Sequence, residues 1–231
     1  MVTRGLICAS VMAGESTDIL AAVSSVAALA DVIEIRLDGL RDPRIASCIA
    51  SLPKPVLVTN RPTWEGGRFT GSEKERIDLL CQALQWGARY VDIELLAAPD
   101  LRARIQRKAK KHGAQVIISN HDFQGTPNAE HLRATLQQMT SSGADIGKIV
   151  TTAASPEDAL RILSLQEVAM AAHFPLSAFA MGAHGAISRL ATLYLGGFMT
   201  YAALSPEQAT APGQITVQNL YTLLSLLEQN P

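Results

Sequence analysis

The feature that most constrains this chain is a regular alternation of short apolar runs with longer amphipathic stretches. Runs of this length predict buried strands, and the stretches between them predict helices. The predicted strands are Leu6–Ala9, Val32–Leu37, Val56–Thr59, Tyr90–Leu95, Val116–Ser119, Ile146–Thr151, Leu176–Met181 and Phe198–Ala202. The predicted helices are Thr17–Ala30, Pro43–Ala50, Glu73–Trp86, Pro99–His112, Ala129–Thr140, Pro156–Ala172, Ile187–Leu195 and Ile215–Glu228. Eight strands alternating with eight helices predict a closed, parallel (β/α)8 TIM barrel of the α/β class.

An open, doubly wound sheet is the competing architecture. No G-x-G-x-x-G follows the first strand, where a dinucleotide-binding sheet of that kind carries it, so the barrel is favoured. No linker-like run divides the 231 residues, which predicts one catalytic domain over residues 1–231. The chain begins almost directly with the first strand, so we expect no N-terminal hairpin closing the barrel floor.

Composition excludes several classes of partner. Apolar residues make up 48% of the chain and charged residues 18%, as in a compact globular enzyme. A net charge of −1 predicts neither a nucleic-acid nor a membrane partner. The longest apolar stretch, 19–30, is too short to span a bilayer, and no signal peptide is predicted. Cys8, Cys48 and Cys81 form no C-x-x-C pair, which indicates reduced, buried thiols in a cytoplasmic protein and neither a disulfide nor a metal site.

Catalytic residues of a barrel lie at the C-terminal ends of its strands. Lys148 lies within the apolar run 146–151, where a charged amine would lose its solvation. Burial lowers a lysine's pKa, and a neutral amine is a nucleophile for ketones. The alternative is a lysine at the edge of a strand that reaches water.

His121 follows the fifth predicted strand and is a candidate proton shuttle, although a lone histidine at a strand end is commonly structural. We expect the other four histidines, His112, His131, His173 and His184, to face solvent.

Two strands carry charged residues two positions apart. Glu34 and Arg36 on the second strand share one face, because side chains of a strand alternate, and so do Asp92 and Glu94 on the fourth. Glu34 and Arg36 would suit a substrate with several hydroxyl groups, and a structural ion pair with Asp92, Glu94 or Arg61 is the alternative. Asp92 and Glu94 are expected to support the catalytic residues.

Two loops add further candidates. Arg61 and Glu65 follow the third strand, and the glycines at 66 and 67 permit a loop that brings Glu65 toward the barrel axis. Arg189 is a candidate for holding a substrate carboxylate, or else an arginine on a helix surface. Residues 204–213 follow the last strand and predict a lid, or else a plain connection.

These motifs together resemble type I 3-dehydroquinate dehydratase. The matching segments are Glu34-Ile-Arg36-Leu-Asp38, Thr59-Asn-Arg61 with Glu65-Gly-Gly67, Asp92-Ile-Glu94-Leu, Ser119-Asn-His121-Asp-Phe123, Lys148-Ile, Met181-Gly182, Ser188-Arg189 and Ala211-Pro-Gly-Gln214. They occur in the order of the family and cover almost the whole chain. The combination is specific to the family, whereas no single segment is.

The resemblance implies a role for each candidate. Lys148 would form a Schiff base with the substrate, His121 would be the general acid and base, and Glu65 would lie beside it. The residues implied in substrate binding are Ser10, Glu34, Arg36 and Arg61 for hydroxyl groups, Arg189 and Gln214 for the carboxylate, and Thr210 for closing the lid. Thr210 replaces the family's usual serine, and because the hydroxyl is kept we expect tuning of the lid without loss of function.

The reaction implied is dehydration of 3-dehydroquinate to 3-dehydroshikimate in the shikimate pathway, without a metal or organic cofactor, by an enzyme that in this family is often a homodimer. A class I aldolase or transaldolase is the nearest rival, but it usually needs a phosphate site near the last two strands, which we do not find. A catalytically inactive barrel used as a scaffold is the rival from another class, and it predicts loss of Lys148, His121 or Arg189, all of which are present.

Overall fold

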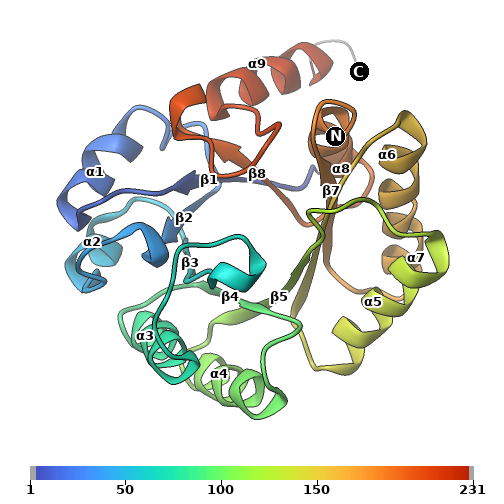
Figure 1. Cartoon of the computed structure of the whole chain (residues 1–231). Coiled ribbons are helices and arrows are strands. Elements are labelled where there is room, and N and C mark those ends of the chain that lie inside the picture. Colours follow the sequence, from blue (N-terminus) through green and yellow to red (C-terminus); the bar gives the residue numbers. More distant parts are fainter. Residues whose placement is uncertain (1–3, 229–231) are drawn as a thin grey trace.

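The computed structural model describes residues 4–228 as a ring of parallel strands surrounded by helices (Figure 1). The strands are β1 (Leu6–Val11), β2 (Val32–Arg36), β3 (Val56–Thr59), β4 (Tyr90–Glu94), β5 (Gln115–His121), β6 (Ile146–Thr152), β7 (Leu176–Met181) and β8 (Met199–Ala203). They lie side by side in the order β7-β6-β5-β4-β3-β2-β1-β8, which is the predicted (β/α)8 barrel.

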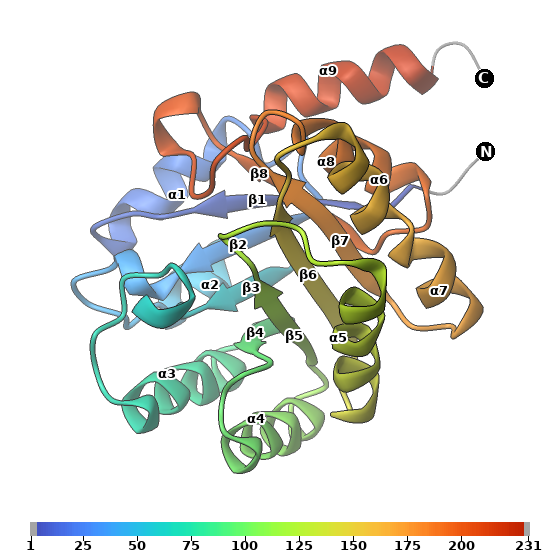
Figure 2. The ribbon, with the colours of Figure 1, turned by 45° about the vertical axis from the view of Figure 1, so that its right-hand side comes forward.

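Helices cover the outside of the ring. They are α1 (Ser16–Ser24), α2 (Ala46–Ser51), α3 (Glu73–Gln85), α4 (Pro99–Lys111), α5 (Ala129–Ser141), α6 (Pro156–Leu163), α7 (Leu165–Ala171), α8 (Ala186–Tyr194) and α9 (Val217–Glu228). Short 3-10 helices lie after β2, β3 and β8: η1 (Leu37–Gly39), η2 (Thr63–Glu65) and η3 (Pro206–Gln208). Figure 2 shows the loops after β3 and β8 at the same end of the barrel.

The predicted elements are all present, with shifted bounds. β1 extends to Val11 and β5 to His121, so Ser10 and His121 are strand residues. The single helix predicted over 156–172 is divided at Ser164 into α6 and α7. The Ser164 hydroxyl donates to the carbonyl of Arg161 at 2.8 Å, a local bond that competes with regular helical structure. In the same way, Ser24 donates to the carbonyl of Ala21, and α1 ends there instead of at Ala30.

The alternation of side chains along each strand separates two apolar layers. Ile33 and Ile35 of β2 belong to the layer between the strands and the helices, whereas Val32 belongs to a smaller cluster inside the ring. Glu34 and Arg36, on the same face of β2 as Val32, border a pocket. The inward face of β2 is therefore apolar at the start of the strand and charged toward its C-terminal end.

The ring has one discontinuous joint among the described residues. β7 and β8 are the two edges of the sheet order and form no ladder with each other. The backbone N–H of Phe198, just before β8, donates to the carbonyl of Leu176 at 2.8 Å, and the N–H of Met199 donates to the Ser177 hydroxyl at 3.1 Å. Further along, the rings of Phe179 and Tyr201 meet across this joint with centroids 6.0 Å apart.

Among residues 4–228, no helix has both the length and the apolar character needed to cross a bilayer.

Candidate active site

A pocket of about 220 Å³ opens at the C-terminal ends of the strands. Nine of the ten residues predicted to form the site line it: Glu34, Arg36, Arg61, Glu65, His121, Lys148, Arg189, Thr210 and Gln214. The tenth, Ser10, does not line the pocket but donates its hydroxyl to Glu34. Residues that are far apart in the sequence converge here because parallel strands bring their C-terminal ends together.

Lys148 lies on β6 with 5% of its surface exposed, so it does not reach water at a strand edge. Its Nζ atom is 3.6 Å from Oδ2 of Asp92 and 3.8 Å from the ring centroid of Tyr201. Burial lowers the pKa of Lys148, and the carboxylates of Asp92 and Glu34 oppose that shift without cancelling it. The amine is therefore more easily deprotonated than an exposed lysine and is held inside the pocket.

His121 faces Glu65 across the mouth of the barrel. Nδ1 of His121 is 2.8 Å from Oε1 of Glu65, and the backbone N–H of His121 donates to the same oxygen at 3.0 Å. Glu65 reaches this position at the end of η2 because Gly66 follows with φ of 76° and Gly67 packs on the Arg61 backbone, where a Cβ atom would lie 2.0 Å from the carbonyl oxygen. Both positions thus require glycine in the conformation that places Glu65 at the pocket.

Burial and nearby charges shift the pKa values of both Glu65 and His121. Burial raises the pKa of Glu65 to about 8, although Arg61 opposes the shift. Burial together with the charges of Arg61 and Lys148 lowers the pKa of His121 well below its usual value. Because Oε1 already accepts the backbone N–H, it suits the role of acceptor toward Nδ1 as well. An ionised Glu65 thus favours the tautomer with the proton on Nδ1 and a free lone pair on Nε2.

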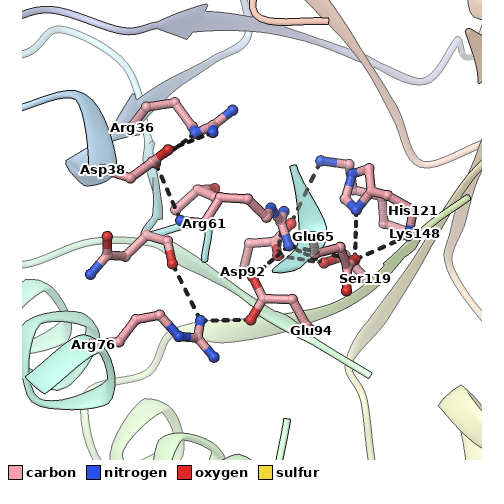
Figure 3. Close-up of polar contacts among 12 residues, drawn as sticks. Arg36, Asp38, Arg61, Glu65, Arg76, Asp92, Glu94, Ser119, His121 and Lys148 are labelled. Atoms are coloured by element: carbon pink, nitrogen blue, oxygen red, sulfur yellow. Dashed lines mark hydrogen bonds and ion pairs between the residues drawn. The ribbon is translucent and has the colours of Figure 1, made fainter. Parts of the chain in front are cut away.

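Arg61 is the centre of a buried ion-pair cluster (Figure 3). Its guanidinium donates to Asp92 at 2.8 Å, to Glu94 at 2.7 Å and to the hydroxyl of Ser119 at 2.8 Å. The second oxygen of Glu94 accepts from Arg76 at 2.6 Å. Asp92 and Glu94 thus hold Arg61 in place. The guanidinium predicted to bind substrate hydroxyls also borders the pocket, but much of its donor capacity is already used.

The pKa values in this cluster follow from its packing. Burial alone would raise the pKa of Asp92, but Arg61 and Lys148 hold it below its usual value. Burial does raise the pKa of Glu94, despite its two arginine partners. Asp92 therefore supplies the negative charge nearest to the Lys148 amine.

The second strand presents its two charges to separate partners. Glu34 accepts hydrogen bonds from the hydroxyls of Ser10 and, at 2.7 Å, Thr59. Arg36 forms a two-pronged pair with Asp38, at 2.8 and 2.7 Å. The structural ion pair considered for Glu34 and Arg36 thus exists only for Arg36, and its partner is Asp38 instead of Asp92 or Glu94. Both side chains still border the pocket.

Arg189 lies on α8 and is 2% exposed, so it is not an arginine of the helix surface. Its guanidinium carbon lies 4.8 Å above the centroid of the Phe179 ring, and one N–H donates to the carbonyl of Pro212 at 3.3 Å. Nε has no hydrogen-bond partner, and among the described residues no carboxylate forms an ion pair with this side chain. Burial lowers the pKa of Arg189 to about 10, so it stays charged at neutral pH. A buried cation without an anion is suited to receive one from a ligand.

The loop after β8 closes one side of the pocket. The N–H of Thr210 donates to Oε1 of Gln214 at 2.7 Å, and its hydroxyl donates to the same oxygen at 3.1 Å. The Thr210 hydroxyl also lies 3.3 Å from that of Ser10 on β1. Ala211 and Pro212 line the pocket. The segment predicted as a lid therefore contacts the site.

Buried residues of the site that were not singled out from the sequence include Arg76, Phe179 and Tyr201. Phe179 and Tyr201 face the inside of the ring, and the alternation of β7 and β8 carried that signal. Arg76 lies on an amphipathic helix, where an arginine is usually exposed, and no local pattern marks it as buried. The four other histidines are exposed and the three cysteines are free and buried, as predicted.

Comparisons with known proteins identify the family of this chain. The model of the type I 3-dehydroquinase family matches residues 7–231. A 3-dehydroquinate dehydratase from Desulfotalea psychrophila is 42% identical over 191 residues, which cover 83% of this chain and 84% of that protein. The type I enzyme from Clostridium difficile, solved with covalently modified comenic acid, superposes with a TM-score of 0.90 at 28% identity, covering 99% of this chain and 94% of that one. The 3-dehydroquinate dehydratase from Geobacillus kaustophilus gives a TM-score of 0.89 at 32% identity, covering 99% and 93%. The chain therefore belongs to the type I 3-dehydroquinase family.

Proposed function

We propose that this member of the family dehydrates 3-dehydroquinate to 3-dehydroshikimate, a step of the shikimate pathway, through a Schiff base on Lys148. The observation that carries the proposal is a buried amine of lowered pKa in one pocket with the His121–Glu65 pair and the unpaired guanidinium of Arg189. A nucleophile, a base and an anion receptor are the three groups that a keto acid needs for this chemistry.

Schiff-base formation begins with the neutral amine of Lys148. Its lone pair attacks the C3 carbonyl carbon, and the carbonyl oxygen takes one proton from the attacking nitrogen and one from solvent and leaves as water. The resulting iminium withdraws electrons from C2 far better than a ketone does, so the C2 hydrogens become acidic. Lys148 is thus the electron sink, and these steps need no metal or organic cofactor.

His121 then moves the proton. Nε2 takes a proton from C2, and the electron pair of that C–H bond forms the C2–C3 double bond of an enamine. The Glu65 carboxylate holds Nδ1–H and stabilises the imidazolium that forms. The enamine electrons return to form the C1–C2 double bond, and the C1 hydroxyl leaves as water with a proton from His121. Water then hydrolyses the iminium, which releases 3-dehydroshikimate and restores the amine.

Substrate orientation rests on the charged groups around the pocket. Arg189 and the amide of Gln214 bind the carboxylate, because the guanidinium has no anionic partner of its own. Glu34 and Arg36 bind hydroxyl groups, and Thr210, which contacts Ser10, closes the loop over the ligand. Arg61 contributes mainly by holding Asp92 near the amine, since much of its donor capacity is already used.

Two measurements test the proposal. Turnover of 3-dehydroquinate is followed by the absorbance of the conjugated enoate product, which separates a dehydratase from an aldolase or an inactive scaffold. Borohydride added during turnover should fix a ligand adduct on Lys148, which peptide mass spectrometry locates. An active enzyme whose Lys148 stays unmodified under these conditions would contradict the Schiff-base mechanism.

Three further properties stay predictions: a cytoplasmic location, a homodimer and one catalytic domain over residues 1–231. The three free and buried cysteines are what a reducing compartment permits. Light scattering of the purified chain measures the assembly, and a monomer at all accessible concentrations would contradict the homodimer.

A further inference from the structure

The two cations that handle the substrate lie on two neighbouring aromatic rings. Nζ of Lys148 is 3.8 Å from the ring centroid of Tyr201, and the Arg189 guanidinium carbon is 4.8 Å from that of Phe179. The two rings contact each other, with centroids 6.0 Å apart. We call Phe179 and Tyr201 the aromatic pair.

From this arrangement we propose that Tyr201 is a further catalytic residue, whose ring face stabilises the positively charged nitrogen of Lys148 in the iminium. The inference rests on the proposed function, because it requires the Schiff base on Lys148. A cation above the face of an aromatic ring is attracted by the negative face of the ring, and the attraction is strong when water is excluded. Tyr201 and Lys148 are both about 5% exposed, so water screens their contact little.

A ring suits this position better than a second carboxylate. Asp92 already lies 3.6 Å from the amine, and another anion there would raise the amine's pKa and remove the neutral nucleophile. A ring attracts the cation more weakly than an anion does, and it supplies no group that competes for the substrate. A planar iminium can also lie flat on the ring, whereas a tetrahedral ammonium cannot.

The phenol hydroxyl of Tyr201 has no hydrogen-bond partner, although it is buried. A buried hydroxyl without a partner destabilises a protein, so this group does not explain why an aromatic residue stands here. The contact that the side chain does make with a reacting atom is made by the ring. The ring, and not the hydroxyl, is therefore the part assigned to catalysis.

The test compares Tyr201→Leu with Tyr201→Phe. Each enzyme forms the imine with the product at a series of pH values, and every sample is stopped in the same borohydride quench. The value of kcat is measured in parallel. Without the ring, the ammonium of free Lys148 and the iminium of the Schiff base both lose stabilisation. We expect Tyr201→Leu to lower kcat about tenfold and to lower the apparent pKa of the amine by about one unit. We expect Tyr201→Phe to recover most of both changes.

The other groups that act on this amine are unchanged in both variants. They are Cys8 on β1, Glu34 on β2, Arg61 after β3, Asp92 on β4 and His121 on β5. Tyr90→Leu is the matched control, since Tyr90 is also an aromatic residue of the inner cluster, but lies at the start of β4 and packs on Phe198. It should lower the thermal midpoint and leave the pKa of the amine as it is.

The outcomes separate the two proposals. A wild-type enzyme that forms no adduct on Lys148 removes the Schiff base itself. A wild-type adduct with an unchanged or raised amine pKa in Tyr201→Leu overturns the role of the ring, and so does an equal shift in Tyr90→Leu. If Tyr201→Phe is as impaired as Tyr201→Leu, the effect belongs to the hydroxyl, and the proposed role of the ring is overturned as well. If Tyr201→Leu does not fold, Tyr201→Met replaces it under the same criteria.

Discussion

Glu65 and His121 meet at 2.8 Å although they are 56 positions apart in the chain. The loop after β3 therefore decides which nitrogen of the histidine on β5 carries the proton. While Glu65 is ionised, the proton lies on Nδ1 and the lone pair of Nε2 faces the pocket. Once Glu65 is protonated toward Nδ1, the imidazole must carry its proton on Nε2 and cannot act as a base.

The pH dependence of the reaction should reveal the ionisation of the Glu65–His121 pair. Burial raises the pKa of Glu65 to about 8, so the active, deprotonated pair is populated above that pH and lost below it. We expect kcat/KM to rise with pH through an apparent pKa near 8, a value that belongs to the pair and not to one residue. Glu65→Gln should abolish this inflection. A profile from pH 6 to 9.5 in which the variant keeps the same inflection would disprove the assignment.

Removal of the imidazole should separate imine formation from proton transfer. General acid–base catalysis contributes roughly 10²–10⁴-fold, so His121→Ala should lower kcat by about that factor. The variant should still form a borohydride-trapped adduct on Lys148, at least slowly. His131→Ala is the control, because His131 is exposed on α5, and it should keep its activity. Near-normal turnover in His121→Ala would remove the residue from the mechanism.

The unpaired guanidinium should govern affinity for the substrate. Arg189→Lys keeps the charge but loses the planar fork, and Arg189→Ala loses both. Charged hydrogen bonds contribute enough for a rise in KM of roughly 10–100-fold in Arg189→Ala, with a smaller rise in Arg189→Lys. Steady-state kinetics measures both variants. An unchanged KM in the alanine variant would show that the carboxylate binds elsewhere.

Arg76 should be important for stability. It is fully buried and donates to Glu94 at 2.6 Å, so Arg76→Met leaves that carboxylate buried with one partner fewer. Breaking a buried pair in this way typically costs about 3–5 kcal/mol. Urea unfolding measures the loss of free energy. Arg104→Met is the control, because its pair with Asp78 is partly exposed, and it should cost no more than about 1 kcal/mol.

The sequence predicted the barrel and most of the site for one physical reason. Side chains alternate along a strand, and the C-terminal ends of parallel strands lie at one face of the barrel. Glu34, Lys148 and His121 could therefore be placed together from the sequence alone. The partners of buried charges were harder to predict. Arg36 at the end of β2 pairs with Asp38 in η1, and Arg76 reaches the cluster from a helix. These contacts depend on side-chain conformations and on loop paths, which residue spacing does not determine. The break of the helix at Ser164 likewise does not follow from residue spacing.

The environment of the catalytic amine depends on closure of the barrel between β7 and β8. Backbone ladders close every other part of the ring, but at this joint Phe179 and Tyr201 meet from opposite sides. Lys148 lies on β6 and its ring on β8, so the two edge strands of the sheet order must come together before the amine acquires the ring of Tyr201. Arg189 and Phe179 both lie on the β7 side of the joint, so their contact does not depend on it. A chain with its wall still open thus leaves the amine in contact with water, and only the closed wall converts it into a buried nucleophile.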